Sequence, residues 1–267
     1  MDPKIQGHYQ SNLSESQRQL FDKYLPESKS GEGQRGRPAM DRTQLYNAIL
    51  YVLKTGCQWR QLPREFGRWQ TVYGYFNSWS KLEVWRGLVE ELTMQYRLEQ
   101  DRYAEPSAGC VDSQSVKVER QGIDVGFDGG KLVKGRKRHV LSDTQGTILC
   151  VVVTAANVGD REGLKMLLNK WFLKGCRLRK IWVDKGYSGE EIRCWVADIK
   201  KTHKIELDVT DKSGQGFEVI PRRWVAERTF AWLMNFRRLS KDVEVLTRNS
   251  EAMIQLAMSS ILVRRLV

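Results

Sequence analysis

Three acidic residues lie in contexts that suit phosphoryl-transfer chemistry. Asp112 and Asp184 each end a short apolar run typical of a strand, and Glu227 lies in a long helical pattern. Breaking a phosphodiester requires an aligned nucleophile and relief for the charge on the leaving oxygen, and two carboxylate-bound divalent ions supply both. Magnesium prefers such oxygen ligands. If the two strands are neighbours, the aspartates converge at one edge, so we predict a site for metal-dependent phosphoryl transfer.

The charge of the chain favours a polyanionic partner. Its 267 residues include 44 Lys and Arg against 32 Asp and Glu, a formal net charge of +12. This excess of basic residues favours nucleic acid over a small neutral substrate. The length allows a sizeable core, and we expect one catalytic domain with one small module.

The cysteines and the apolar runs indicate the compartment. Five cysteines are widely separated, with no C-x-x-C pair and only three histidines, so we expect no structural zinc site and reduced thiols in the core. The longest apolar stretch, from Ile148 to Val158, is interrupted by Thr154 and is far shorter than a membrane span. The amino terminus is polar. We therefore expect a cytoplasmic protein.

Residues 1–100 have the pattern of a helical, helix-turn-helix-like DNA-binding domain with a linker near 28–38. Ser14 with Gln17 forms a capping box, and Asp41 begins a helix that Gly56 closes. Two more helices are predicted at about 70–80 and 83–96. Polar residues there, Gln70 among them, could face a DNA groove. The alternative is that the aromatic residues of this helix are simply core, and both can hold on opposite faces.

The linker contains a weaker DNA-binding signal. Arg35 and Arg37 lie in an Arg-Gly-Arg-Pro sequence that resembles a minor-groove hook. A plain linker is the preferred interpretation, because four residues are a weak signal.

Residues 105–267 predict an α/β catalytic domain with a mixed sheet and flanking helices. Strands are expected at 109–116, 137–142, 148–155, 179–183 and 205–209, and the glycine-rich segment 121–135 as a flexible connection. Asp160 is expected to cap one helix, and Ser188 with Glu191 to form a capping box for another. A helix of more than four turns is predicted from near Pro221.

The last helix can be tested by its geometry. At 100° per residue, three basic residues fall within about 40° of Glu227, opposite an apolar stripe; they are Arg223, Arg238 and Lys241. A solvated charged face is the competing interpretation for an isolated helix.

The three acidic motifs resemble those of the DDE transposases of bacterial insertion sequences, in particular the insertion sequence 5-like branch. The resemblance covers nearly the whole chain. It rests on the segments Val111–Lys117, Val183–Tyr187 and Arg222–Leu233, and extends to Thr55–Pro63, Lys134–His139 and Arg237–Asp242.

This resemblance implies a ribonuclease H-like domain that holds two Mg²⁺ ions, replaceable by Mn²⁺, between Asp112, Asp184 and Glu227. In that family water hydrolyses the strand at the element's end, and the freed 3′ hydroxyl attacks target DNA. The implied partner is double-stranded DNA, as terminal inverted repeats and as target. A homodimer on DNA and a nucleoid-associated location in a bacterium are also implied.

One branch of the family carries a Tyr, Arg, Glu, Lys signature on the final helix. Arg223 and Glu227 fit it, but Ile220 and Met234 occupy the Tyr and Lys places. Arg238, one turn beyond Met234 in the predicted helix, is our candidate for the missing basic residue.

Further basic and polar residues are candidates for DNA contact. Lys185 and Tyr187 follow Asp184 directly and could touch the scissile phosphate, although a tight turn and simple packing explain them equally well. Phosphate contacts need only charge and reach. On this ground we extend the prediction to Arg136, Lys137, Arg138, Arg223, Arg228, Arg238 and Lys241.

Three functions compete. The first is a transposase, the second is a nuclease of the same fold that cuts without joining, and the third is a catalytically silent DNA-binding regulator. Joining of a cut 3′ end to a second duplex separates the first from the second. Loss of activity on chelation separates both enzymes from the regulator, and an inactive copy of a transposase remains a further alternative.

Overall fold

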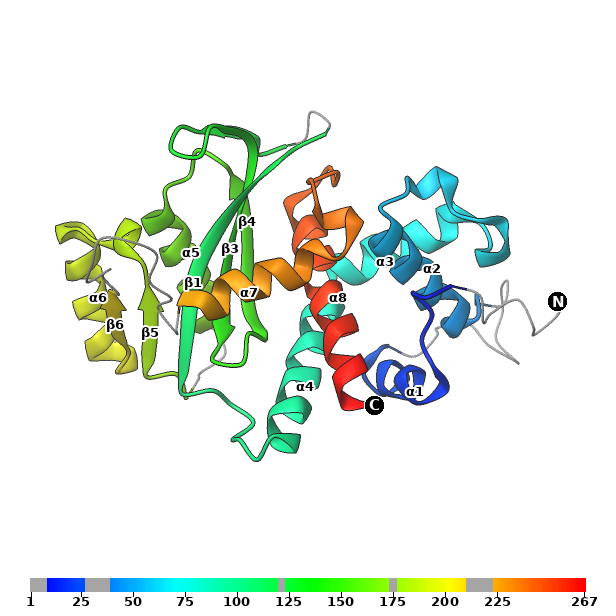
Figure 1. Ribbon diagram of the computed structural model, residues 1–267, viewed down its shortest axis with the longest axis horizontal. Helices are drawn as coiled ribbons and strands as arrows, with labels where there is room; N and C mark the ends of the chain where they lie inside the picture. The colour runs from blue at the N-terminus through cyan, green and yellow to red at the C-terminus, as the bar shows by residue number, and fades with distance from the viewer. Residues whose placement is uncertain (1–8, 27–38, 120–122, 173–176, 210–222) are drawn as a thin grey trace.

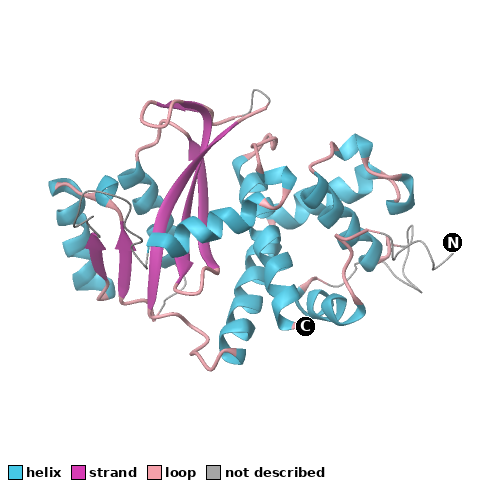
Figure 2. Cartoon of the chain, viewed as in Figure 1, coloured by secondary structure: helices cyan, strands magenta, loops and turns pink. Residues whose placement is uncertain are grey.

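The computed structural model describes residues 9–26, 39–119, 123–172, 177–209 and 223–267. A mixed β-sheet with flanking helices forms one end of the molecule, and a cluster of helices forms the other (Figures 1 and 2). Within these residues no helix is both long and apolar enough to cross a membrane.

The helical end begins with α1 (Glu15–Tyr24), α2 (Arg42–Thr55), α3 (Trp69–Lys81) and α4 (Val84–Glu99). The predicted capping box of Ser14 and Gln17 is confirmed, as is the Asp41 cap, whose carboxylate accepts from the Gln44 backbone N–H at 2.8 Å. Gly56 ends α2 in a left-handed conformation with φ of 73°. Two short 3₁₀ turns, η2 (Trp59–Gln61) and η3 (Arg64–Phe66), separate α2 from α3.

The last helix of the chain, α8 (Thr247–Leu266), returns to this helical end and lies beside α4 (Figure 1). Its side chains share one hydrophobic core with α2, α3 and α4, and that core also includes Val140 and Val151 of the sheet. The two predicted parts, residues 1–100 and 105–267, thus share packed side chains. Their division into two domains stays a prediction.

Six strands form the sheet, and the five longest run in the order β4, β3, β1, β5, β6. Strand β3 is antiparallel to both of its long neighbours, β1 and β4, whereas β5 is parallel to both β1 and β6. The five predicted strands are confirmed as β1 (Ala108–Lys117), β3 (Val133–Asp143), β4 (Ile148–Ala155), β5 (Lys180–Val183) and β6 (Glu206–Val209). A short β2 (Gly126–Asp128) pairs with the start of β3, in the segment predicted to be a flexible connection.

Helices cover both faces of the sheet. The helices α5 (Asp160–Phe172) and α6 (Glu190–His203) pack on the face that carries Val111 and Ile181. On the other face, Val225 and Ala226 of α7 (Arg223–Met234) pack on Cys110 and Trp182. The predicted Ser188 capping box is wrong, because Gly189 precedes α6 and no side chain caps it.

The predicted length of α7 is also wrong. The helix ends at Met234 and the chain turns into the 3₁₀ segment η5 (Arg237–Leu239). Arg238 and Lys241 therefore do not share a helical face with Glu227. In this turn Arg238 joins a buried ionic network.

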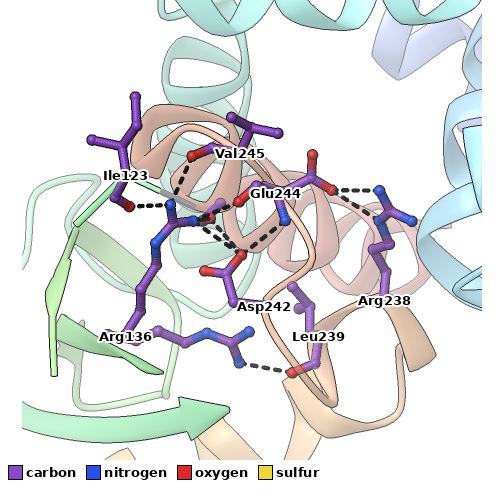
Figure 3. A network of polar contacts seen from close by, with 9 residues as sticks. Ile123, Arg136, Arg238, Leu239, Asp242, Glu244 and Val245 are labelled. Atoms are coloured by element: carbon purple, nitrogen blue, oxygen red, sulfur yellow. Dashed lines mark hydrogen bonds and ion pairs between the residues drawn. The ribbon is translucent and has the colours of Figure 1, made fainter. Parts of the chain in front are cut away.

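That network joins β3 to the segment between α7 and α8 (Figure 3). Arg136 is fully buried; its guanidinium pairs with Asp242 at 3.2 Å and donates to the Glu244 carbonyl at 2.8 Å. Arg238 pairs with the Glu244 carboxylate at 2.8 Å and donates to the Cys57 carbonyl at 2.9 Å. The network thus connects the segment after α7 to strand β3 on one side and to the segment between α2 and η2 on the other.

Three predicted DNA contacts are corrected by this network. Arg136, Arg138 and Arg238 are 0%, 1% and 7% exposed, and their guanidinium groups donate to carboxylates and carbonyls within the protein. Burial lowers the pKa of Arg138 to about 10. These arginines hold the fold together and are not presented to DNA, and Arg238 does not replace the missing lysine of the final-helix signature.

Replacing Arg136 with Met should destabilise the protein strongly. The change leaves the Asp242 carboxylate buried without its partner, which costs about 3–5 kcal/mol of unfolding free energy. Urea denaturation checks this, with Arg193→Met as control because its side chain is 74% exposed. A loss below about 0.5 kcal/mol, the range of ordinary surface substitutions, would contradict the assigned role.

His139 makes stability depend on pH. Its ring is fully buried on β3, lies 3.0 Å from the Thr154 hydroxyl, and packs so closely on α5 that a Cβ on Gly163 would lie 2.1 Å from it. Burial lowers the pKa of His139 to about 4. The unfolded chain therefore binds a proton that the folded chain rejects between about pH 4 and its ordinary pKa of about 6.5.

The unfolding free energy should therefore fall as pH is lowered through that window, by about 3 kcal/mol from this residue. Urea denaturation at about pH 7 and about pH 4.5 measures the slope. His139→Gln should flatten the slope, whereas His203→Gln, on the exposed end of α6, should leave it unchanged. An equal slope in His139→Gln would show that carboxylates alone produce the acid sensitivity.

Candidate functional site

The pairing of β1 with β5 places the two candidate aspartates together. The parallel register pairs Gly109 with Ile181 and Cys110 with Trp182. Continuing it by two residues brings Asp112 opposite Asp184, on strands that lie about 4.8 Å apart. Asp112 does not lie at the edge of the sheet, because β1 continues to Lys117; it is β5 that ends there.

Helix α7 approaches these aspartates from one face. Residues two apart on a strand share a face, so Asp112 faces the same side as Cys110, and Asp184 continues the side of Trp182. Val225 and Ala226 pack on these two residues. Glu227 is the next residue of α7 and is exposed. The three acids therefore belong to the same side of the sheet.

The donor set suits a hard divalent cation, because it consists of carboxylate oxygens. The Asp112 carboxylate accepts from the Ser113 backbone N–H at 2.7 Å, and the Asp184 carboxylate accepts from the Gly186 N–H at 2.9 Å. Among the residues that the structure describes, however, no three His, Cys, Asp or Glu side chains stand close enough to hold a metal ion. Asp112 and Asp184 come from neighbouring strands, and Glu227 comes from α7.

A fourth carboxylate, missed in the sequence, lies near the turn after Asp184 and contacts Ser113, the residue after Asp112. Asp160 is the first residue of α5, and it accepts from the Ser113 hydroxyl at 2.7 Å and pairs with Lys137 at 3.3 Å. We expected Asp160 only to cap its helix. Its position after an Asn-Val-Gly turn gives no signal of a site, because the contact with Ser113 spans 47 residues.

Tyr187 is buried beneath the acids and does not face solvent. Its side chain is fully buried against Val183 and Ile192. Burial raises the pKa of Tyr187 well above its ordinary value, and the charges of Asp112, Asp160 and Asp184 raise it further. The predicted phosphate contact is therefore wrong for Tyr187, because the packing alternative holds.

Lys137 is also committed within the protein. It is 6% exposed and lies 3.3 Å from both Asp128 and Asp160. Burial alone would raise the pKa of Asp128, but hydrogen bonds from Ser115 and from the Lys131 backbone, with the charge of Lys137, lower it to about 2. Lys137 is a counterion for these carboxylates and is not available for a phosphate.

The remaining predicted contacts fall into two groups. Arg228 is half-buried between the Trp224 and Trp232 rings and donates to the Gln145 carbonyl at 3.0 Å, whereas Gln70 and Lys241 are exposed. Arg35 and Arg37 lie outside the described residues, as do the side chains of Lys185 and Arg223. For this second group the DNA-contact hypothesis stays a prediction.

The thiols agree with the expected core role in part. Within the described residues Cys57, Cys110, Cys150 and Cys194 form no disulfide; Cys110 and Cys150 are buried and Cys194 is exposed.

Comparisons with known proteins agree with the fold and the motifs. A family model described as "Transposase DDE domain" matches residues 103–262, and one described as "Putative transposase of IS4/5 family" matches residues 13–89. The chain is 34% identical over 112 residues to the "Putative transposase for insertion sequence element IS402" of Burkholderia cepacia, which covers 39% of this chain and 52% of that protein. It is 32% identical over 110 residues to the "Insertion element IS402 uncharacterized 16.2 kDa protein" of the same organism, covering 40% of this chain and 74% of that protein.

The chain thus spans about half the length of the first of these relatives. The DDE model covers more than half of the chain and includes β1, β5 and α7 with all three candidate acids. The mixed sheet of antiparallel and parallel strands is consistent with a ribonuclease H-like domain. On these grounds the chain belongs to the transposase DDE domain family.

Proposed function

We propose that this transposase cleaves the ends of an insertion sequence in a metal-dependent reaction and joins the freed 3′ hydroxyl to target DNA. The observation that supports the proposal is the β1–β5 register, which pairs Cys110 with Trp182 and, continued by two residues, would set Asp112 opposite Asp184. Family membership and the net charge of +12 support DNA as the substrate.

In this proposal Asp112, Asp184 and Glu227 bind two Mg²⁺ ions. The ions would supply charge relief at the leaving oxygen and a more acidic water. The two aspartates provide the fixed part of the site, since Asp112 lies on β1 and Asp184 directly follows β5, its parallel neighbour. Glu227 provides the third ligand from α7, whose backbone is held against the same strands by Val225 and Ala226. Ser113 is not proposed as a nucleophile, because its hydroxyl donates to Asp160.

DNA contact is assigned to the exposed residues of the predicted set. Gln70 lies at the start of α3 and Lys241 follows η5. Arg228 could reach a phosphate only by leaving its two tryptophan rings. Two element ends must be brought together for transposition, so we also propose that a homodimer forms on DNA.

Two other functions remain as alternatives. A nuclease of the same fold would cut element ends without joining them, and a silent regulator would bind DNA without cutting. No observation on the chain favours either over the transposase, because the DDE family match includes all three acidic motifs.

Asp112→Asn should reduce Mg²⁺-dependent cleavage of element-end DNA to the level seen with chelator, because the amide removes one ligand charge. DNA affinity should be unchanged. Asp198→Asn is the matched control, since that side chain is 77% exposed on α6. Cleavage that persists in the Asp112 variant would refute the assigned site.

A joining assay separates the transposase from the nuclease. A pre-cut element end with a free 3′ hydroxyl should be transferred to a supercoiled target plasmid by the wild-type chain and not by the Asp184→Asn variant. Efficient cutting with no joined product would identify the nuclease instead.

A further inference from the structure

We infer that Asp160 is a positioning residue that holds Asp112 and Asp184 in their metal-binding arrangement. This inference rests on the proposed function, and it concerns a residue outside the acidic trio.

Toward Asp112, Asp160 acts through Ser113. The Ser113 hydroxyl donates to Asp160 at 2.7 Å, its backbone N–H donates to Asp112 at 2.7 Å, and its carbonyl accepts from Lys131 at 3.0 Å. The hydroxyl, the backbone N–H and the carbonyl of Ser113 are thus all engaged, and the residue is 8% exposed. Asp160 therefore fixes the strand segment on which the Asp112 carboxylate is oriented.

Toward Asp184, Asp160 packs on the turn that follows β5. A Cβ built on Gly186 would lie 3.0 Å from the Asp184 carboxylate and 3.5 Å from that of Asp160. The two carboxylates thus flank the same glycine from its side-chain direction. Asp160 contacts the surroundings of both candidate ligands, although these lie on different strands.

Lys137 balances the charge of this arrangement. It lies between Asp160 and Asp128, 3.3 Å from each. Asp128 in turn accepts from the Ser115 hydroxyl at 2.5 Å. Ser113 and Ser115 share one face of β1. Asp160 and Asp128, which Lys137 bridges, therefore each hold one of these serines, in the part of the strand that follows Asp112.

Asp160 is assigned a positioning role because one of its oxygens already serves Ser113 and Lys137. Removing an outer contact of this kind typically weakens metal affinity or activity by about 10–100-fold. Asp160→Asn keeps the shape and removes the charge. Glu162→Gln is the matched control, because it changes the same charge on α5 at a side chain that is 61% exposed.

The test measures Mn²⁺ binding to the full chain by electron paramagnetic resonance, together with Mg²⁺-dependent cleavage of element-end DNA. Asp160→Asn should weaken Mn²⁺ binding and slow cleavage by about 10–100-fold each, with DNA affinity in chelator unchanged. Ser113→Ala should produce a similar change, and the double variant should be no worse than Asp160→Asn alone, since the two residues act as one unit.

The possible outcomes separate the two proposals. If the wild-type chain binds Mn²⁺ without cleaving, the proposed function fails while the Mn²⁺ affinities still test Asp160. Wild-type Mn²⁺ affinity in both Asp160→Asn and Ser113→Ala overturns the inference, as does the absence of Mn²⁺ binding in the wild type. If Asp160→Asn does not fold, Ser113→Ala alone decides.

Discussion

The parallel pairing of β1 with β5 is the constraint on which the candidate site depends. It brings residues 72 positions apart into register, Cys110 with Trp182 among them, and continued by two residues it would set Asp112 opposite Asp184. One face of this strand pair receives α7 and the other receives α5. A shift of one residue would turn one aspartate to the opposite face, because side chains alternate along a strand.

The buried ionic network is the second constraint, since it determines where α7 ends. Arg238 leaves the helical path to pair with Glu244, and Arg136 holds Asp242 beneath it (Figure 3). The network also brings together three segments that were singled out separately in the sequence, Thr55–Pro63, Lys134–His139 and Arg237–Asp242. The basic and glycine residues of these segments pack against one another inside the protein. For example, a Cβ on Gly56 would lie 3.1 Å from Arg237. Charge pairs of this kind specify one arrangement, because each buried charge is costly without its partner.

Much of the fold could be predicted from the sequence, and the failures have physical causes. Alternating and apolar runs correctly predicted five strands, and the Ser14 and Asp41 caps were confirmed because capping depends on neighbouring residues. The end of α7 could not be predicted, because it depends on a salt bridge to Glu244 and on the Cys57 carbonyl, 181 residues away. Helix α8 is buried on nearly all sides, so it has no polar face whose period would reveal its orientation. Basic residues in motifs were interpreted as DNA contacts, but for Arg136, Lys137 and Arg138 burial decided otherwise. Asp160, at the start of α5, had no local signal, since its partner Ser113 lies on β1, 47 residues away.

The proposed function requires that Asp112, Asp184 and Glu227 surround one metal site. Replacing Mg²⁺ with Fe²⁺ in the presence of ascorbate and peroxide generates hydroxyl radicals at the bound ion, which cut the nearby backbone, and mass spectrometry locates the cuts. Cuts are expected to cluster next to residues 112, 184 and 227 and to be suppressed by excess Mg²⁺. Cuts confined to other segments, or cuts at 112 and 184 with none near 227 even when element-end DNA is bound, would contradict it.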